Sequence, residues 1–184
     1  MSENTATLAS LSSNSISEQG DFVKTVAVYP GTFDPITNGH VDLIKRAASI
    51  YPKVIVLVAA DTRKECMFTM DERVNMVREG VDKLCPNVQV EPFQGLLVEI
   101  VKKYGAKIIL RGLRAVSDFE YESQMALMNR RLEKGIETFF MISSEEYAYL
   151  SSSFVKEIAG LGGDVSTMVP AGVDKELRKR FFKV

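Results

Sequence analysis

Val26-Ala-Val-Tyr-Pro-Gly-Thr-Phe-Asp-Pro-Ile-Thr-Asn-Gly-His40 is the stretch that decides how this chain is organised. It begins as an apolar strand, expected over 24–29, which Pro30 and Gly31 should stop. A helix is expected to open at 37–40, because apolar residues then recur at helical spacing. A glycine after a strand lets backbone approach a ligand, and the unpaired N–H groups of a helix start attract phosphate. The stretch therefore predicts a phosphate site that includes His40, the only histidine in the chain.

Each residue of this stretch also has an ordinary structural interpretation. His40 could cap the helix or pack against it, Gly31 could serve a simple turn, and the Thr32 hydroxyl could bind nearby backbone. The combination of strand, glycine turn, threonine and histidine at a helix start favours phosphate handling over any of these alone.

Composition limits the classes of function. A chain of 184 residues suits one domain, and a formal net charge of -1 argues against nucleic acid or an anionic membrane as partners. No apolar run approaches the roughly 18 residues that span a bilayer. The spacing of Cys66 and Cys85 fits neither a metal site nor a redox motif and indicates reduced thiols in a cytoplasmic protein. A single disulfide between them stays as an alternative.

The N-terminal segment, 1–22, is rich in Ser, Asn and Thr and contains no Lys or Arg. Secretory and mitochondrial signals need basic residues, so we expect neither here. We expect a disordered tail over 1–22 and one domain over 23–184.

The rest of the chain alternates apolar strands with helices. Expected strands lie at 53–60, 88–92, 107–110 and 137–142, and expected helices at about 70–84, 96–104, 117–134, 154–159 and 173–182. The run Val54–Val58 is apolar without alternation, as in a parallel strand buried on both faces. Capping boxes are expected at Thr69–Glu72 and Ser117–Glu120. The fold class is α/β: a single doubly wound domain with a five-stranded parallel sheet and helices on both faces.

Two further motifs carry chemistry. Arg111-Gly-Leu-Arg114 directly follows an expected buried strand, so its arginines could clamp a phosphate or pair with acidic residues of the next helix, Asp118, Glu120 or Glu122. Ser151-Ser-Ser153 precedes a short helix with Lys156 near its first turn. It could be an anion cradle or a plain N-cap.

Taken in order, these motifs resemble those of a known family. Gly-Thr-Phe-Asp-Pro with Asn-Gly-His resembles the first signature of the nucleotidylyltransferases. Together with Arg-Gly-Leu-Arg, Asp-Phe-Glu-Tyr-Glu and Ser-Ser-Ser-Phe-Val-Lys, it is similar to the bacterial phosphopantetheine adenylyltransferases. The resemblance runs from about Thr25 to the C-terminus. Leu150 and Lys156 depart from the wider superfamily's last motif, which usually has Ile and Arg there.

The resemblance implies an enzyme with a Rossmann-like fold that joins ATP and 4′-phosphopantetheine to give dephospho-coenzyme A and pyrophosphate. It implies catalytic roles for Thr32, His40, Lys64 and Arg114. It implies an ATP site formed by Thr32, Phe33, His40, Gly112, Leu113, Arg114, Glu122, Tyr147, Ala148, Tyr149, Leu150, Ser151, Ser152 and Ser153. It implies a phosphopantetheine site formed by Thr32, Lys64, Leu97 and Arg111.

The resemblance also implies a magnesium ion on the triphosphate, with no metal site made by protein ligands, and a homohexamer. The phosphate of phosphopantetheine is largely ionised at neutral pH, because its second pKa is near 6, so it needs no general base. Alignment and hydrogen-bond donors would carry the catalysis. Two alternatives stay open: another nucleotidylyltransferase, such as one acting on nicotinate mononucleotide, and a non-catalytic nucleotide-binding module.

Overall fold

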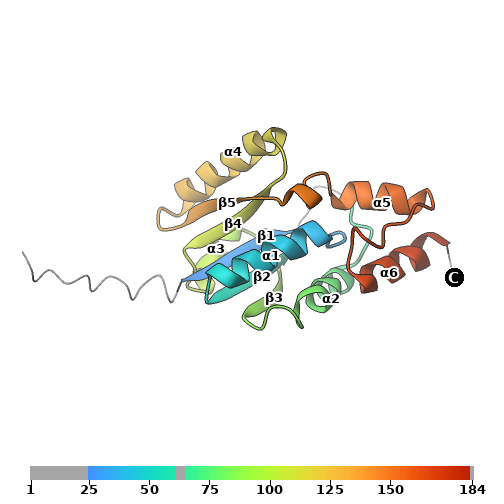
Figure 1. Cartoon of the computed structure of the whole chain (residues 1–184). Helices are drawn as coiled ribbons and strands as arrows, with labels where there is room; N and C mark the ends of the chain where they lie inside the picture. Colours follow the sequence, from blue (N-terminus) through green and yellow to red (C-terminus); the bar gives the residue numbers. More distant parts are fainter. Residues whose placement is uncertain (1–24, 61–64, 183–184) are drawn as a thin grey trace, which may run out of the picture.

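The computed structural model describes residues 25–60 and 65–182. Within these residues, five parallel strands form one sheet in the order β3-β2-β1-β4-β5 (Figure 1). The strands are β1 (Val26–Gly31), β2 (Lys53–Ala59), β3 (Val88–Phe93), β4 (Ile108–Leu113) and β5 (Glu137–Ile142). The helices are α1 (Asn38–Ile50), α2 (Met70–Val81), α3 (Leu97–Lys103), α4 (Val116–Leu132), α5 (Ser152–Gly160) and α6 (Ala171–Phe182), with a short 3-10 turn, η3 (Glu145–Tyr147).

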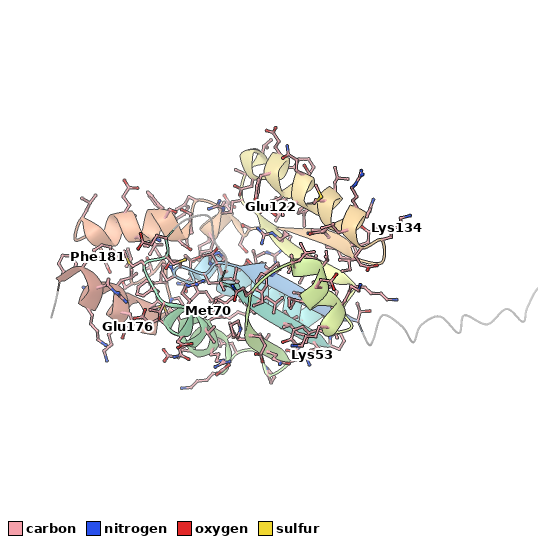
Figure 2. All side chains as sticks on the ribbon, turned by 180° about the vertical axis from the view of Figure 1, so that it is seen from behind. Lys53, Met70, Glu122, Lys134, Glu176 and Phe181 are labelled. Carbon is pink, nitrogen blue, oxygen red and sulfur yellow. The ribbon has the colours of Figure 1, made fainter. Side chains whose placement is uncertain are left out.

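The sheet is buried on both faces, as the unbroken apolar run of β2 predicts. Val54 to Val58 are fully buried, and alternate residues enter two separate core clusters. Val56 packs in the cluster with α1, α2, α5 and α6, whereas Ile55 packs in the cluster with α3. Seen from behind, α3 lies in front of the sheet and α4 lies above it, next to β5 (Figures 1 and 2). The predicted α/β architecture is confirmed.

The first strand runs two residues further than expected. β1 includes Pro30 and Gly31, which pair in register with Leu57 and Val58 of β2. The N–H and C=O of one strand residue point to the same side, and the Pro30 carbonyl faces β4, where it accepts from Arg111. A hydrogen on the Pro30 nitrogen would also point toward β4, past the end of the β1–β4 ladder, whose pairs are Ala27–Ile108 and Val28–Ile109. Proline at this position therefore costs the sheet no hydrogen bond.

The fourth strand is also longer than predicted. Arg111, Gly112 and Leu113 belong to β4 and pair with β5, instead of forming a loop after it. A side chain on Gly112 would meet Leu43 of α1, since its Cβ would lie 2.5 Å from Cδ1. Because Arg111 pairs with Phe140 of β5, the point at which its side chain leaves the sheet is fixed.

One of the two expected capping boxes forms. Thr69 accepts from the N–H of Glu72, and the Glu72 carboxylate accepts from Thr69, as predicted for the start of α2. The box expected at Ser117–Glu120 is wrong, because α4 begins at Val116 behind an N-cap, Ala115, that makes no side-chain cap. Asp118 instead accepts from the Arg114 N–H and guanidinium, which anchors the helix start earlier in the chain.

Two features of composition have structural counterparts. Cys66 and Cys85 are not joined to each other, so the disulfide that the sequence left as an alternative is not formed. Among the described residues, no helix combines the length and the apolar character needed to cross a bilayer. The expected tail, 1–22, lies outside the described residues.

Candidate active site

The site lies where the strand order reverses. β1 to β3 are added toward one edge of the sheet, after which β4 returns to the other side of β1. In open α/β sheets, ligands bind at the carboxyl ends of the strands at this switch point. The ladder between β1 and β4 stops at Val28 and Ile109, so the strands' last residues leave room between them.

The end of β1 is shaped around the buried ring of Phe33. This ring packs against Gly31 so closely that a Cβ there would lie 2.7 Å from its Cζ, which explains why the position is glycine. Phe33 has a φ of 50°, a left-handed conformation that is uncommon for a side-chain-bearing residue. Its ring contacts Tyr29 and His40 edge-on, with the His40 centroid 5.2 Å away. The tight turn at Phe33 thus brings the strand end and the start of α1 together.

His40 is held by a reciprocal cap at the start of α1. The Thr37 hydroxyl accepts from the His40 N–H, and the Thr37 N–H donates to His40 Nδ1 at 3.0 Å. Because Nδ1 accepts this bond, the proton of the neutral imidazole is on Nε2. His40 is therefore the partner of Thr37 in a helix-capping box, which is the ordinary interpretation of this residue. It also lines a cavity at the ends of the strands.

The surroundings keep His40 neutral. Burial is the largest influence, followed by the charges of Arg114 and Arg111, and together they lower its pKa to about 4. At neutral pH the ring acts as a hydrogen-bond donor through Nε2, without a positive charge.

Arg111 makes a two-pronged ion pair with Glu122 of α4. Its Nε and Nη2 donate to the two carboxylate oxygens at 2.7 and 2.6 Å, and Nη1 donates to the Pro30 carbonyl. Burial lowers the pKa of Arg111, but the hydrogen bonds and charge of Glu122 outweigh burial and raise it. Glu122, labelled in Figure 2, lies toward the N-terminal end of α4. The sequence left two roles open for Arg111, a phosphate clamp and a pair with an acidic residue of the next helix. The structure shows the pair with the helix.

Arg114 is placed by the start of α4 and by the segment before α5. Its Nε and Nη2 each donate to Asp118 at 3.1 Å, and Nη1 donates to the Leu150 carbonyl at 3.2 Å. Burial raises the pKa of Asp118, whereas its bonds from Arg114 lower it, and the net shift is downward. The Arg114 side chain is partly exposed and lines a cavity at the ends of the strands.

The serine motif joins α5 to the loop after β1. Ser151 caps α5 by accepting from the Phe154 N–H, and the Ser152 hydroxyl donates to the Pro35 carbonyl at 2.7 Å. Lys156 forms an ion pair with the buried carboxylate of Asp34, which also accepts from two backbone N–H groups. Burial raises the pKa of Asp34, but Lys156 and these N–H groups lower it further than burial raises it. Lys156 therefore anchors the helix, and its ammonium is already paired.

A first cavity opens between β1, β4, α1 and the segment before α5. The predicted ATP-site residues that line it are Thr32, Phe33, His40, Gly112, Arg114, Glu122, Tyr147, Leu150, Ser151 and Ser152. Four others, Leu113, Ala148, Tyr149 and Ser153, are not part of this lining. Leu113 is buried in the sheet, and Tyr149 is mostly exposed to solvent. Phe33 contributes a buried ring, so a ligand would meet mainly its backbone.

A second cavity lies on the other side of Arg111 and Glu122. The two cavities share Pro30, Gly31, Thr32, Arg111 and Glu122. Apolar side chains dominate the remainder of the second lining, which is made of Ala59, Phe93, Gly95, Leu96, Leu97, Tyr121, Met125, Ala126, Asn129 and Thr138. Leu97 and Arg111 were predicted for the phosphopantetheine site and both lie here. Residues 121, 125 and 129 recur every four positions along α4, a helical spacing that could have revealed this wall.

Two further points concern charge and metal binding. Lys64 lies outside the described residues, so its place in the site stays a prediction. Among the described residues, no group of three or more His, Cys, Asp or Glu side chains is arranged to hold a metal ion.

Comparison with known proteins identifies the family of this chain. A cytidylyltransferase-like family model matches residues 28–158, which hold all three motifs. A phosphopantetheine adenylyltransferase from Heliobacterium modesticaldum is 55% identical over 157 residues, covering 85% of this chain and 93% of that protein. The phosphopantetheine adenylyltransferase of Moorella thermoacetica is 52% identical, covering 85% of this chain and 97% of that protein.

A solved structure supports the fold. Plasmodium falciparum nicotinic acid mononucleotide adenylyltransferase, complexed with NaAD, matches with a TM-score of 0.64 at 12% identity, over 86% of this chain and 96% of that one. At this identity the match shows the shared Rossmann-like fold alone. The identity of about one residue in two to the curated relatives shows more: this chain belongs to the phosphopantetheine adenylyltransferase family.

Proposed function

We propose that this enzyme transfers the AMP group of ATP to 4′-phosphopantetheine, giving dephospho-coenzyme A and pyrophosphate. The observation that carries the proposal is the pair of cavities that meet at Thr32 and Arg111. A polar cavity and a largely apolar one are joined at their phosphate-binding ends, as a reaction between two phosphate-bearing substrates requires. Family membership supports the same reaction.

ATP is assigned to the first cavity. His40, Thr32 and Arg114 line it, and two helix starts border it, at Thr37 and Ser151. Helix starts and arginines are the groups that favour phosphates. Tyr147 and Leu150 also line it and offer apolar surface for the base. The predicted ATP residues that line this cavity keep their assigned roles in the proposal.

Phosphopantetheine is assigned to the second cavity. Phe93, Leu97 and Met125 suit the methyl-bearing chain of pantetheine, and the buried amide of Asn129 suits its peptide-like groups. The phosphate would lie at the shared end, near Thr32 and Arg111, with Lys64 as its further partner. Arg111 is already paired with Glu122, so it is expected to contribute its remaining N–H groups without breaking that pair.

In this mechanism the nucleophile comes from the substrate. The phosphate oxygen of phosphopantetheine attacks the α-phosphorus of ATP, and the bond from that phosphorus to the pyrophosphate oxygen breaks. The protein aligns the two phosphates and donates hydrogen bonds to the oxygens that gain charge. Neutral His40 supplies one such donor through Nε2 and needs to give up no proton, which fits its low pKa.

Magnesium is proposed to enter with ATP, bound to the triphosphate. The two carboxylates at the first cavity, Asp118 and Glu122, are both paired with arginines, so the protein groups that face the nucleotide are mainly donors. A bound magnesium ion would offset part of the charge of the triphosphate.

A homohexamer is proposed for the assembly, on the strength of the family resemblance and of an apolar surface on α4 and β5. Exposed apolar side chains gather there, namely Val116, Phe119, Leu127, Met128, Leu132, Phe139 and Ile142. β5 is an edge strand of the sheet, and a patch of this kind marks protein–protein contacts. Sedimentation of the wild type and of a Leu127→Glu variant tests this, since the charge should break the assembly.

The cytoplasm is proposed as the compartment. Cys66 and Cys85 are not joined by a disulfide, which suits a reducing environment. Expression with a fluorescent tag, followed by cell fractionation, tests this placement.

The deciding experiment measures pyrophosphate release from ATP and magnesium with each acceptor separately. Release with 4′-phosphopantetheine, with dephospho-coenzyme A as product, is the expected result. Release only with nicotinate mononucleotide would retain the fold and the role of His40 but reject the second-cavity assignment. ATP binding without release for either acceptor would indicate a non-catalytic binding module.

The Lys64 assignment has its own test. Lys64→Ala should raise the KM for phosphopantetheine more than the KM for ATP, because the proposal gives it the acceptor's phosphate. A variant that loses only ATP affinity would reverse the two subsites.

A further inference from the structure

Arg73 of α2 is a buried charged residue for which the mechanism so far has no use. Its side chain is only 3% exposed. Its side chain donates to three backbone carbonyls: Nε donates to Phe68 at 3.2 Å, and Nη1 donates to Thr32 at 2.7 Å and Ala59 at 2.8 Å. A buried guanidinium is costly unless its donors are used, so this placement needs a reason.

The two bonds of Nη1 lie where the ladder between β1 and β2 ends. Gly31 and Val58 are the last pair of that ladder, and Thr32 and Ala59 are the residues that directly follow them. One nitrogen therefore joins the carboxyl ends of neighbouring strands beyond their last pair. Thr32 is itself exposed and lines both cavities. The Arg73 guanidinium holds its carbonyl from the side of α2.

We propose that Arg73 is a positioning residue that fixes Thr32 for the transfer step, an inference that rests on the proposed adenylyl transfer. Phe33, the next residue, has a left-handed backbone. The Thr32 carbonyl belongs to the peptide group that enters this turn. Holding that carbonyl sets the direction in which the Thr32 hydroxyl leaves the backbone. A small misplacement of a group that aligns substrates can cost a large part of the rate.

The arrangement calls for arginine specifically. The planar fork presents Nε and Nη1 to separate segments at the same time, the one before α2 and the two strand ends. A lysine keeps the charge but has one nitrogen at the end of a flexible chain, so it cannot hold all three carbonyls in this geometry.

A double-mutant cycle tests the inference. Arg73→Lys, Thr32→Ala and the combined variant are compared with the wild type by pyrophosphate release, measuring kcat and both KM values below each variant's melting temperature. We expect Arg73→Lys to lower kcat by about 10- to 100-fold. In the Thr32→Ala background the same change should alter kcat by less than about threefold, because the group it positions is gone.

Two control variants separate positioning from stability. Val77→Ala creates a cavity in the buried face of the same helix, and Arg78→Lys alters another α2 arginine that donates to a strand carbonyl, that of Val90. Neither residue lines either of the two cavities. Both variants should keep kcat within about twofold of the wild type, even where Val77→Ala lowers the melting temperature as much as Arg73→Lys does.

Several results would overturn the inference. These are a wild-type kcat in Arg73→Lys, independent effects of the Arg73 and Thr32 changes, or an equal kcat loss in Val77→Ala at equal melting temperature. If Arg73→Lys does not fold, Arg73→Gln replaces it in the cycle; if neither folds, Arg73 serves only the fold and the positioning role is rejected. Inactive wild-type protein would instead reject the proposed function.

Discussion

The two cavities of this protein share one wall but differ in what they offer a ligand. The first is bordered by two helix starts and holds His40, Arg114 and Ser151, whereas the second is lined mostly by apolar side chains of β3, α3 and α4. Their common wall contains Thr32 and the Arg111–Glu122 ion pair. In the proposed mechanism, the linings away from the wall distinguish the two substrates, whereas the transferring phosphate meets Thr32 on the wall and His40 and Arg114 in the first cavity. Changes in the second cavity should therefore affect phosphopantetheine alone, changes on the wall should affect both substrates, and loss of His40 should lower kcat.

The largest effect is expected in the first cavity from His40→Ala. Removing a donor to charge that develops in the transition state typically lowers kcat by about 100- to 1,000-fold. Nucleotide affinity, measured by calorimetry, should change far less. His40→Gln is the matched variant, because glutamine at this position can restore the cap with Thr37. Recovery of the melting temperature without recovery of kcat would separate capping from chemistry, and normal turnover in His40→Ala would remove His40 from the mechanism.

The shared wall is tested by Glu122→Gln. An amide cannot accept both prongs of Arg111, so the guanidinium loses its fixed direction between the cavities. We expect kcat/KM to fall by about tenfold for ATP and for phosphopantetheine alike. Glu137→Gln, which breaks an exposed pair with Arg130, is the control and should change neither. A loss confined to one substrate would mean that the wall belongs to one cavity only.

The second cavity is tested by Asn129→Leu. The substitution removes a buried amide from the lining and leaves the first cavity intact. Loss of one hydrogen bond should raise the KM for phosphopantetheine by about tenfold, with the KM for ATP unchanged. Gln124→Leu, an exposed amide on the same helix, should behave as wild type. An equal rise in both KM values would contradict the separation of the cavities.

The smallest effect concerns pH, and the single histidine makes it measurable. The NMR signal of His40 should titrate with a pKa of about 4, with the neutral proton on Nε2. The unfolded value is about 6.5, so the stability contributed by neutral His40 is complete above about pH 6.5 and is lost as the pH falls toward 4. Melting temperatures of His40→Gln should therefore depend less on pH over that range. A His40 pKa of 6 or higher would contradict the cap described here.

Local sequence patterns predicted many elements of this fold because those elements form through contacts between neighbouring residues. The unbroken apolar run of β2, the Thr69–Glu72 box and the serine cap of α5 each depend on residues within a few positions of one another. The same rule failed at Ser117–Glu120, where Asp118 is engaged by Arg114 and the helix starts at Val116. The ends of β1 and β4 were also misjudged, since strand length depends on which neighbour continues the ladder.

The sequence by itself determined the α/β class, the phosphate-handling motifs and the two possible roles of the arginines, because residue type and spacing carry that chemistry. Only the tertiary structure decided the rest. It paired Arg111 with Glu122 and Lys156 with Asp34, it turned Arg73 beneath Thr32, and it placed Asn129 in the second cavity. The paired residues lie between 11 and 122 positions apart, and their contacts depend on how distant strands and helices pack together, which no local pattern specifies.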